Sequence, residues 1–186
     1  MRITLLLFIF CFGLLSSYGQ TKHSTTKKHA PGKQHLVSAA IHLPFGEFSD
    51  THIGGLAVEY AWSDHRFGRQ PSLPSKKIGF LATGGVAYYF GEKETVNGYP
   101  YDYPGYLFIH IYPGLVFNVD KKLAISLAAG PGLGIYNGTT RFNLGAVVQV
   151  SYSISERIAI SPGILLMKEN GADPLIAASV KSSWSF

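Results

Sequence analysis

The sequence predicts an all-β chain that folds as an eight-stranded, antiparallel, up-and-down transmembrane β-barrel. Three observations support this fold: an alternating C-terminal segment over 175–186, seven further segments with the same two-residue period, and an N-terminus of the kind that directs export. One face of the C-terminal segment is apolar and gains aromatic residues toward its end: Ile176, Ala178, Val180, Ser182, Trp184 and Phe186. An exposed Trp-x-Phe end promotes aggregation in water but contacts lipid in a membrane barrel.

Residues 1–20 are expected to be a secretory signal peptide. Arg2 precedes an apolar run over 3–15, and small or polar residues follow at 16–20. The run is shorter than the roughly 20 residues that a retained membrane anchor needs, which favours cleavage over the anchor alternative. Cys11, the only cysteine, lies within this run, so the mature chain is expected to lack thiols, as suits an oxidising compartment.

Residues 21–34 are expected to form a flexible, basic periplasmic segment. They are rich in Lys, His, Ser and Thr and contain too few apolar residues to offset the entropy of ordering. His23, His29 and His35 have no compact ligand spacing, so no metal site is expected. Loss of Arg2 with the signal leaves 15 basic and 11 acidic residues. On an exported protein this excess favours lipid phosphates or peptidoglycan as partners over nucleic acid.

Residues 35–186 are expected to be the barrel, and the clearest strand covers 141–155. Its even positions are mostly apolar: Phe142, Leu144, Ala146, Val148, Val150, Tyr152 and Ile154. Its odd positions are mostly polar or small: Arg141, Asn143, Gly145, Val147, Gln149, Ser151 and Ser153. A strand buried in a parallel sheet would be apolar on both faces, so this pattern predicts one lipid face and one lumen face.

The same rule places the other strands, in order, at 36–43, 53–63, 77–90, 106–119, 123–136, 157–168 and 175–186. Eight is an even number, as single-chain bacterial barrels require, and every strand but the first has at least the 9–11 residues of a tilted crossing. With both termini in the periplasm, the turns at 120–122 and 155–156 are periplasmic and short. The connections at 92–105 and 168–174 are external and longer, and Asn137-Gly138 predicts a tight external hairpin. The long 64–76 connection has no explanation in the sequence.

Three prolines fall in the middle of predicted strands, each followed by a glycine. Pro113, Pro131 and Pro162 each remove a hydrogen-bond donor from the sheet, which argues against a central strand. All three lie on the predicted lipid face, and the alternation continues through them. We therefore expect them to mark bulges or bends within continuous strands.

Three short segments resemble the porin-like outer-membrane β-barrel domain family, of the small eight-strand kind that includes the OmpA membrane domain and OmpX. These are LPFGEFS at 43–49, VAYYF at 86–90 and the terminal Trp184-x-Phe186. The resemblance covers residues 35–186 and implies a location in the outer membrane, surrounded by its lipid. Trp184 and Phe186 are the expected signal for the barrel-assembly machinery. The resemblance implies no catalytic residues, and we expect a monomer without cofactor.

Several polar side chains are expected to line the lumen as a network: His42, Glu59, Lys77, His110, Arg141, Gln149, Arg157 and Lys181. An eight-stranded lumen is narrow and is normally filled by side chains, so these residues are interpreted as a structural plug. Glu59 is the only acid among them, and one or more of the basic side chains should reach it. The alternative is a small-solute pore, because Ala and Gly along 123–136 would leave wet gaps.

A tyrosine-rich external connection is the candidate binding surface. Tyr99, Tyr101, Tyr103 and Tyr106 alternate there, which favours either an unidentified extracellular ligand or an aromatic belt folded at the barrel mouth. A lipid-modifying enzyme would need a serine and a histidine on the lipid face, but His110 is expected to point inward. A soluble lipocalin-like carrier would reverse the two faces. The expected function is therefore non-catalytic: envelope structure or surface interaction through the external loops.

Overall fold

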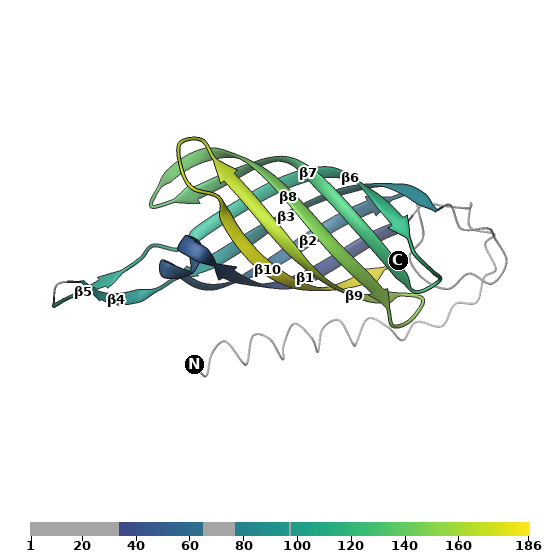
Figure 1. Ribbon diagram of the computed structural model, residues 1–186, viewed down its shortest axis with the longest axis horizontal. Helices are drawn as coiled ribbons and strands as arrows, with labels where there is room; N and C mark the ends of the chain where they lie inside the picture. Colours follow the sequence, from purple (N-terminus) through teal and green to yellow (C-terminus); the bar gives the residue numbers. More distant parts are fainter. Residues whose placement is uncertain (1–33, 65–76, 97) are drawn as a thin grey trace. The chain divides into compact units, whose positions relative to one another are not determined.

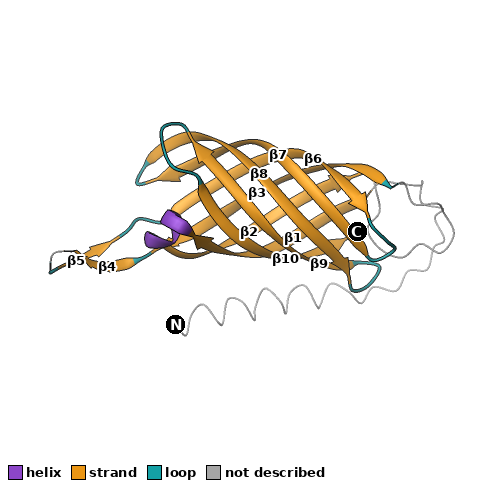
Figure 2. Ribbon diagram, in the orientation of Figure 1, coloured by secondary structure: helices purple, strands orange, loops and turns teal. Residues whose placement is uncertain are grey.

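The computed structural model describes residues 34–64, 77–96 and 98–186, in which eight strands close into an antiparallel barrel (Figures 1 and 2). The expected signal peptide, residues 21–33 and most of the 64–76 connection lie outside the described residues. Around the barrel the order is β1-β10-β9-β8-β7-β6-β3-β2. The strands are β1 Gln34–Phe45, β2 His52–Ser63, β3 Ile78–Gly91, β6 Tyr106–Asn118, β7 Leu123–Tyr136, β8 Thr139–Ser153, β9 Ile158–Glu169 and β10 Leu175–Ser185. The predicted fold class is confirmed.

The first strand is longer than the sequence pattern indicates. β1 has 12 residues and begins at Gln34, although the polar composition of residues 21–34 predicts that Gln34 belongs to the preceding segment. Gln34 is opposite Ser63 of β2, and Leu36 is opposite Ser185 of β10. Because β1 closes the barrel between the first hairpin and the last strand, its full length is set by pairing on both sides.

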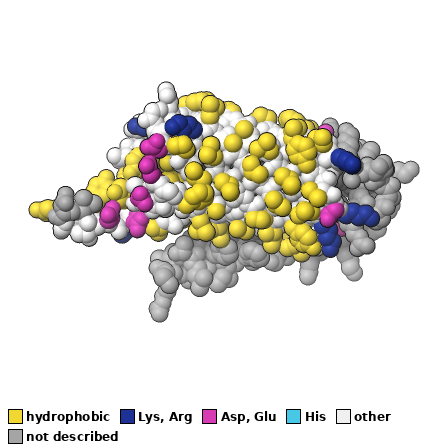
Figure 3. All heavy atoms as spheres, viewed as in Figure 1, with side chains coloured by type: hydrophobic (Ala, Val, Ile, Leu, Met, Phe, Trp, Pro, Cys, Tyr) yellow, Lys and Arg dark blue, Asp and Glu magenta, His cyan; other side chains and the backbone are white. Residues whose placement is uncertain are grey.

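The strands alternate between a buried and an exposed face. In β8, Phe142 and Leu144 are 58% and 60% exposed, whereas Asn143 and Gln149 are buried. Apolar side chains cover the barrel face visible in Figure 3, and charged side chains gather at its ends. This arrangement confirms the two-face rule and contradicts the carrier alternative, which would put the apolar side chains inside.

Aromatic side chains on the outer surface gather near both ends of the strands. The end where β1 begins and β10 finishes carries Tyr60, Phe80, Phe117, Tyr152 and Phe186, together with the half-buried Trp62 and Trp184. The opposite end carries Phe45, Tyr88, Phe90 and Phe142. Two girdles around an apolar band are typical of transmembrane barrels. Among the described residues, no helical segment is both long and apolar enough to cross a bilayer.

The mid-strand prolines do not produce bulges. Pro131 lies opposite Leu144 and Leu133 lies opposite Phe142, so the β7–β8 register is the same on both sides of the proline. Between β6 and β7 the pairing is interrupted from 111 to 113 and resumes in the same register. Of the expected bulges or bends, the bulges are therefore wrong, because a missing N–H removes a ladder bond without adding a residue.

The connections at one end of the barrel carry most of the additional structure. Asn137 and Gly138 form the predicted tight turn, with φ angles of 48° and 75°. The 3-10 helix η1, Gly46–Asp50, joins β1 to β2 and buries Phe48. The expected loop between β3 and β6 contains a separate two-stranded ribbon, β4 Lys93–Val96 and β5 Tyr99–Asp102. We call this end of the barrel the ribbon end.

Candidate functional site

The structure divides the eight predicted lumen residues into two groups. Five are buried inside the barrel: His42, Glu59, His110, Gln149 and Lys181. The other three, Lys77, Arg141 and Arg157, are exposed at the strand ends. For these three the expectation of a lumen position is corrected, because alternation determines the face of a strand but not the depth along it, and side chains near the ends reach water.

Lys181 and Glu59 form the central contact of the buried group. Lys181 Nζ lies 2.7 Å from Glu59 Oε2, and each side chain is 9% exposed. The two residues belong to β10 and β2, which flank β1. On β1, Ser38 and Ala40 lie opposite Glu59 and Lys181, and their small side chains leave room for the longer ones to meet. A buried charge needs such a partner to offset its lost hydration.

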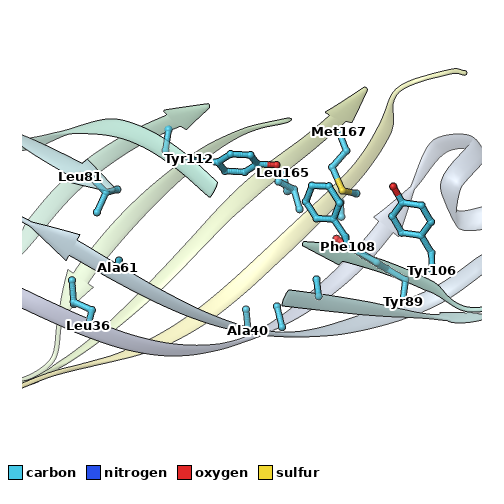
Figure 4. Packing of buried hydrophobic residues seen from close by; sticks show 14 of the residues in the cluster. Leu36, Ala40, Ala61, Leu81, Tyr89, Tyr106, Phe108, Tyr112, Leu165 and Met167 are labelled. Carbon is cyan, nitrogen blue, oxygen red and sulfur yellow. The ribbon is translucent and has the colours of Figure 1, made fainter. Parts of the chain in front are cut away.

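Aromatic rings fill the lumen toward the ribbon end. Successive ring contacts connect Phe48, His52, Tyr89, Tyr106, Phe108, His110 and Tyr112. The ring centres of Phe48 and Tyr89 are 4.9 Å apart, and those of His110 and Tyr112 are 4.5 Å apart. Figure 4 shows the labelled rings gathered in one part of the lumen, with Leu36, Ala61 and Leu81 in the other. We call this set the aromatic column.

Tyr106 belongs to this column and not to the external binding surface. It is the first residue of β6, and its hydroxyl donates a hydrogen bond of 2.8 Å to Glu169 Oε1. Asn143 Nδ2 donates to the same hydroxyl. The expectation that Tyr106 binds a ligand outside the barrel is therefore wrong. Tyr106 is already part of β6, and the alternation of that strand turns its ring into the lumen.

Glycines on neighbouring strands make room for the rings. A Cβ at Gly132 would lie 2.7 Å from the Phe108 ring, and one at Gly55 would lie 2.7 Å from the Tyr89 ring. A Cβ at Gly145 would overlap the Tyr112 hydroxyl. The small residues of 123–136 therefore do not leave wet gaps on this side, because side chains from β3 and β6 occupy the space.

A second buried acid was missed by the sequence pattern. Glu169 is 7% exposed and contacts Tyr106, Asn143 and Arg141, whose Nη1 lies 3.5 Å from Glu169 Oε2. The predicted strand ended at Lys168, one residue too early. Extending the alternation of Ala159 through Met167 by two residues would have placed Glu169 on the lumen face.

The lumen away from the ribbon end is lined mainly by small hydroxyl side chains. Ser38 and Ser183 share a hydrogen bond of 2.8 Å, and Ser161 and Ser151 share another of 2.8 Å. Between these pairs and Lys181 lies a cavity of about 30 Å³. That volume exceeds the roughly 10–15 Å³ that one water molecule needs, so this chamber can hold water.

The exposed tyrosines lie on the ribbon. Tyr99 is 76% exposed and Tyr101 is 48% exposed, and the rings of Tyr101 and Tyr103 meet edge to face at 4.8 Å. Lys93 Nζ and Asp102 Oδ2 are 2.6 Å apart across the two strands. Three of the four predicted loop tyrosines therefore share the ribbon and its base.

The described histidines all contact aromatic rings. His42 Nδ1 lies 2.7 Å from the Tyr89 hydroxyl, His35 contacts Tyr60, His52 packs on Phe48, and His110 packs on Tyr112. No cluster of three or more His, Cys, Asp or Glu side chains suited to a metal ion occurs in the part of the chain that the structure describes.

Comparison with solved structures agrees with this architecture. The crystal structure of Ail, the attachment invasion locus protein of Yersinia pestis, matches with a TM-score of 0.52 at 11% identity, over 84% of this chain and 100% of that one. Ail in a phospholipid bilayer nanodisc matches with a TM-score of 0.55 at 10% identity, over 83% and 99%. This chain has the fold of the small eight-stranded outer-membrane barrels. The predicted resemblance is thus confirmed at the level of the fold.

A third match is Ail in complex with the heparin analogue sucrose octasulfate, with a TM-score of 0.51 at 10% identity over 84% of this chain and all of that one. No protein-family model matches the sequence, and no curated protein matches it either. The likeness therefore concerns the barrel and its strand order, and the individual side chains described above belong to this sequence.

Proposed function

We propose that this protein is a non-catalytic, integral outer-membrane barrel that displays the β4–β5 ribbon for contact with molecules outside the cell. The proposal rests on the different side chains of the two faces of the barrel. The outward face offers apolar side chains and two aromatic girdles to lipid, whereas the inward face is occupied by the aromatic column and the Glu59–Lys181 pair.

The filled lumen favours a structural role over the pore alternative. The column of rings occupies the ribbon end, and the cavity beside Ser38, Ser151 and Lys181 has a volume of about 30 Å³. An enzyme is less favoured because His42 and His110 are buried against tyrosines inside the barrel. Interior histidines cannot serve a lipid substrate that approaches from the membrane.

A heparin-like ligand, as the solved Ail complex contains, is a poor match for the ribbon end of this chain. The described residues at this end include three basic side chains, Lys93, Arg141 and Lys168. They include seven acidic ones: Glu47, Asp50, Glu92, Glu94, Asp102, Glu169 and Asp173. A sulfated polyanion would be repelled by this excess of carboxylates, so the surface favours an uncharged or cationic partner.

Cysteine labelling of cells tests the proposed display. We would introduce Tyr99→Cys on the ribbon and Lys121→Cys in the turn between β6 and β7, at the opposite end of the barrel. Cys11 is the only natural cysteine, so the unaltered chain controls for background labelling. A maleimide that cannot cross membranes should label Cys at 99 on intact Gram-negative cells, and Cys at 121 only after the outer membrane is permeabilised. Labelling of 121 but not 99 on intact cells would contradict the proposal.

Membrane insertion is the other part of the proposal. Trp184 lies opposite Val37 and Ile158, and the Phe186 N–H donates to the His35 carbonyl. These contacts support a role for the last residues in closing the barrel during assembly, with membrane lipid and the barrel-assembly machinery as partners and a monomer as the product.

A further inference from the structure

The ribbon has two chemically different faces. Residues directly opposite in a β-pair project from the same face, and neighbours along one strand project from opposite faces. Glu94 is opposite Tyr101, whereas Lys93 is opposite Asp102. Tyr99 shares the face of Tyr101, and the Tyr103 hydroxyl donates to Glu94 Oε2 at 3.4 Å. One face thus carries tyrosines and a carboxylate, and the other carries the Lys93–Asp102 ion pair.

Two rings on the tyrosine face form a corner. The Tyr101 and Tyr103 rings are 4.8 Å apart at an interplanar angle of 81°, so they stand as two perpendicular walls. Partial burial and the neighbouring Glu94 carboxylate raise the pKa of Tyr103, so its ring remains a neutral phenol at physiological pH. We call Glu94, Tyr101 and Tyr103 the tyrosine corner.

The carboxylate of the corner has no cationic partner among the residues that the structure describes. Lys93 lies on the opposite face with Asp102, and Arg141 pairs with Glu169. Glu94 and Tyr101 are both exposed to solvent. The corner therefore combines a negative charge with ring faces whose quadrupoles also attract positive charge.

We propose that the tyrosine corner binds the cationic side chain of a lysine or arginine on a protein partner outside the cell. The inference rests on the proposed display of the ribbon and names the chemistry of its partner. Perpendicular aromatic walls beside a carboxylate favour an ammonium or guanidinium group, through cation–π attraction and charge. Tyr99 extends the same face beyond the corner and offers further contact area to a peptide. The acidic excess at this end of the barrel favours approach of a basic partner.

Short peptides on the refolded full chain provide the test. Acetyl-Gly-Lys-Gly-amide and its arginine counterpart supply the cation, and the norleucine peptide supplies the same chain without charge. Binding is followed by NMR shifts of tyrosine ring resonances. The lysine and arginine peptides should shift Tyr101 and Tyr103 in a saturable manner, and the norleucine peptide should not. Equal binding of the norleucine peptide would overturn the proposal. So would a result in which tetramethylammonium binds but neither the lysine nor the arginine peptide does.

Matched variants separate the corner from the rest of the ribbon. Tyr101→Leu and Glu94→Gln should each weaken peptide binding by about two- to five-fold, whereas Tyr101→Phe retains the ring and should bind nearly as the parent does. Thr95→Val, on the opposite face, should leave binding unchanged. Unchanged peptide binding by the Tyr101→Leu variant would overturn the proposal that the tyrosine corner is the binding site. If Cys at 99 is labelled on intact cells but the peptides do not bind, the cation inference fails and the proposed display stands.

Discussion

Lys181 and Glu59 form a buried ion pair that passes over β1, the strand between their own two strands. Their Nζ and Oε2 atoms are 2.7 Å apart, although the residues are separated by 122 positions in sequence. Because β1 is where the first hairpin meets the last strand, the pair connects both sides of the closing seam. We interpret it as a contact that depends on, and reports, a closed barrel.

Removing one partner should be costly. Lys181→Met leaves the Glu59 carboxylate buried without its counter-charge, and we expect a loss of roughly 3–5 kcal/mol in the free energy of unfolding. Urea unfolding in lipid vesicles, followed by fluorescence of Trp62 and Trp184, measures this loss. Combining it with Glu59→Leu should recover much of the stability. Lys121→Met in an exposed turn is the control, and equal stability of Lys181→Met and this control would refute the interpretation.

The fit between lumen glycines and rings predicts a position-specific effect. Gly132→Ala places a methyl group against the Phe108 ring, which overpacks the lumen and should cost about 1–3 kcal/mol. Gly54→Ala is the matched control, because its nearest contact would be an ordinary 3.5 Å to the His42 carbonyl. Adding Phe108→Leu to the Gly132→Ala variant should relieve the overpacking and restore part of the lost stability. Equal unfolding midpoints for the two alanine variants would argue against a filled lumen.

The β7–β8 turn depends on its left-handed backbone. Gly138 has a φ of 75°, which an alanine side chain disfavours, so Gly138→Ala should destabilise the barrel by about 1 kcal/mol. Gly138→Asn should cost less, since asparagine tolerates this conformation better. The urea midpoints of the two variants provide the measurement. A larger loss for asparagine than for alanine would be inconsistent with the turn geometry.

Asp120 should titrate below its ordinary value. Its Oδ1 accepts hydrogen bonds from the backbone N–H groups of Lys122 and Leu123, at 2.6 and 2.8 Å, and these bonds lower its pKa from 3.8. The stabilisation is therefore fully present above the ordinary value and is lost as the pH falls through the lowered one. The carboxyl carbon shift of Asp120 against pH, compared with that of the urea-unfolded chain, checks the direction. A titration midpoint of Asp120 that is higher in the folded than in the unfolded chain would contradict the two hydrogen bonds of this turn.

The fold could be predicted from sequence because each barrel strand obeys one local rule. Phe142 is exposed and Asn143 is buried as the alternation requires, and Asn137-Gly138 forms the expected turn. The rule does not report depth, so it placed Arg157 in the lumen although this residue lies at the rim. It also does not fix strand ends, which is why Tyr106, the first residue of the predicted strand 106–119, was grouped with the loop tyrosines and Glu169 was missed.

The partnerships inside the barrel required the structure. The expected network contains several basic side chains that could pair with Glu59. Only the strand register across β1 identifies Lys181 as the one that reaches it. The sequence likewise does not show that Phe108 fills the space beside Gly132, because this contact depends on the β6–β7 register, in which Gly132 is opposite His110 and Phe108 is opposite Gly134. The β4–β5 ribbon is short and contains Pro100, so its alternation is not evident in the sequence. The alternation becomes clear only when Glu94 is seen opposite Tyr101.

Side chains fill the lumen, and we propose that the protein acts through its external ribbon. Ion conductance of the refolded full chain in planar lipid bilayers is the decisive measurement, because a continuous water path would carry ions. We predict no steady ion conductance above that of the bare bilayer, since the aromatic column closes the ribbon end of the lumen. Steady, reproducible single-channel steps from the unaltered chain would contradict the account and favour a small-solute pore.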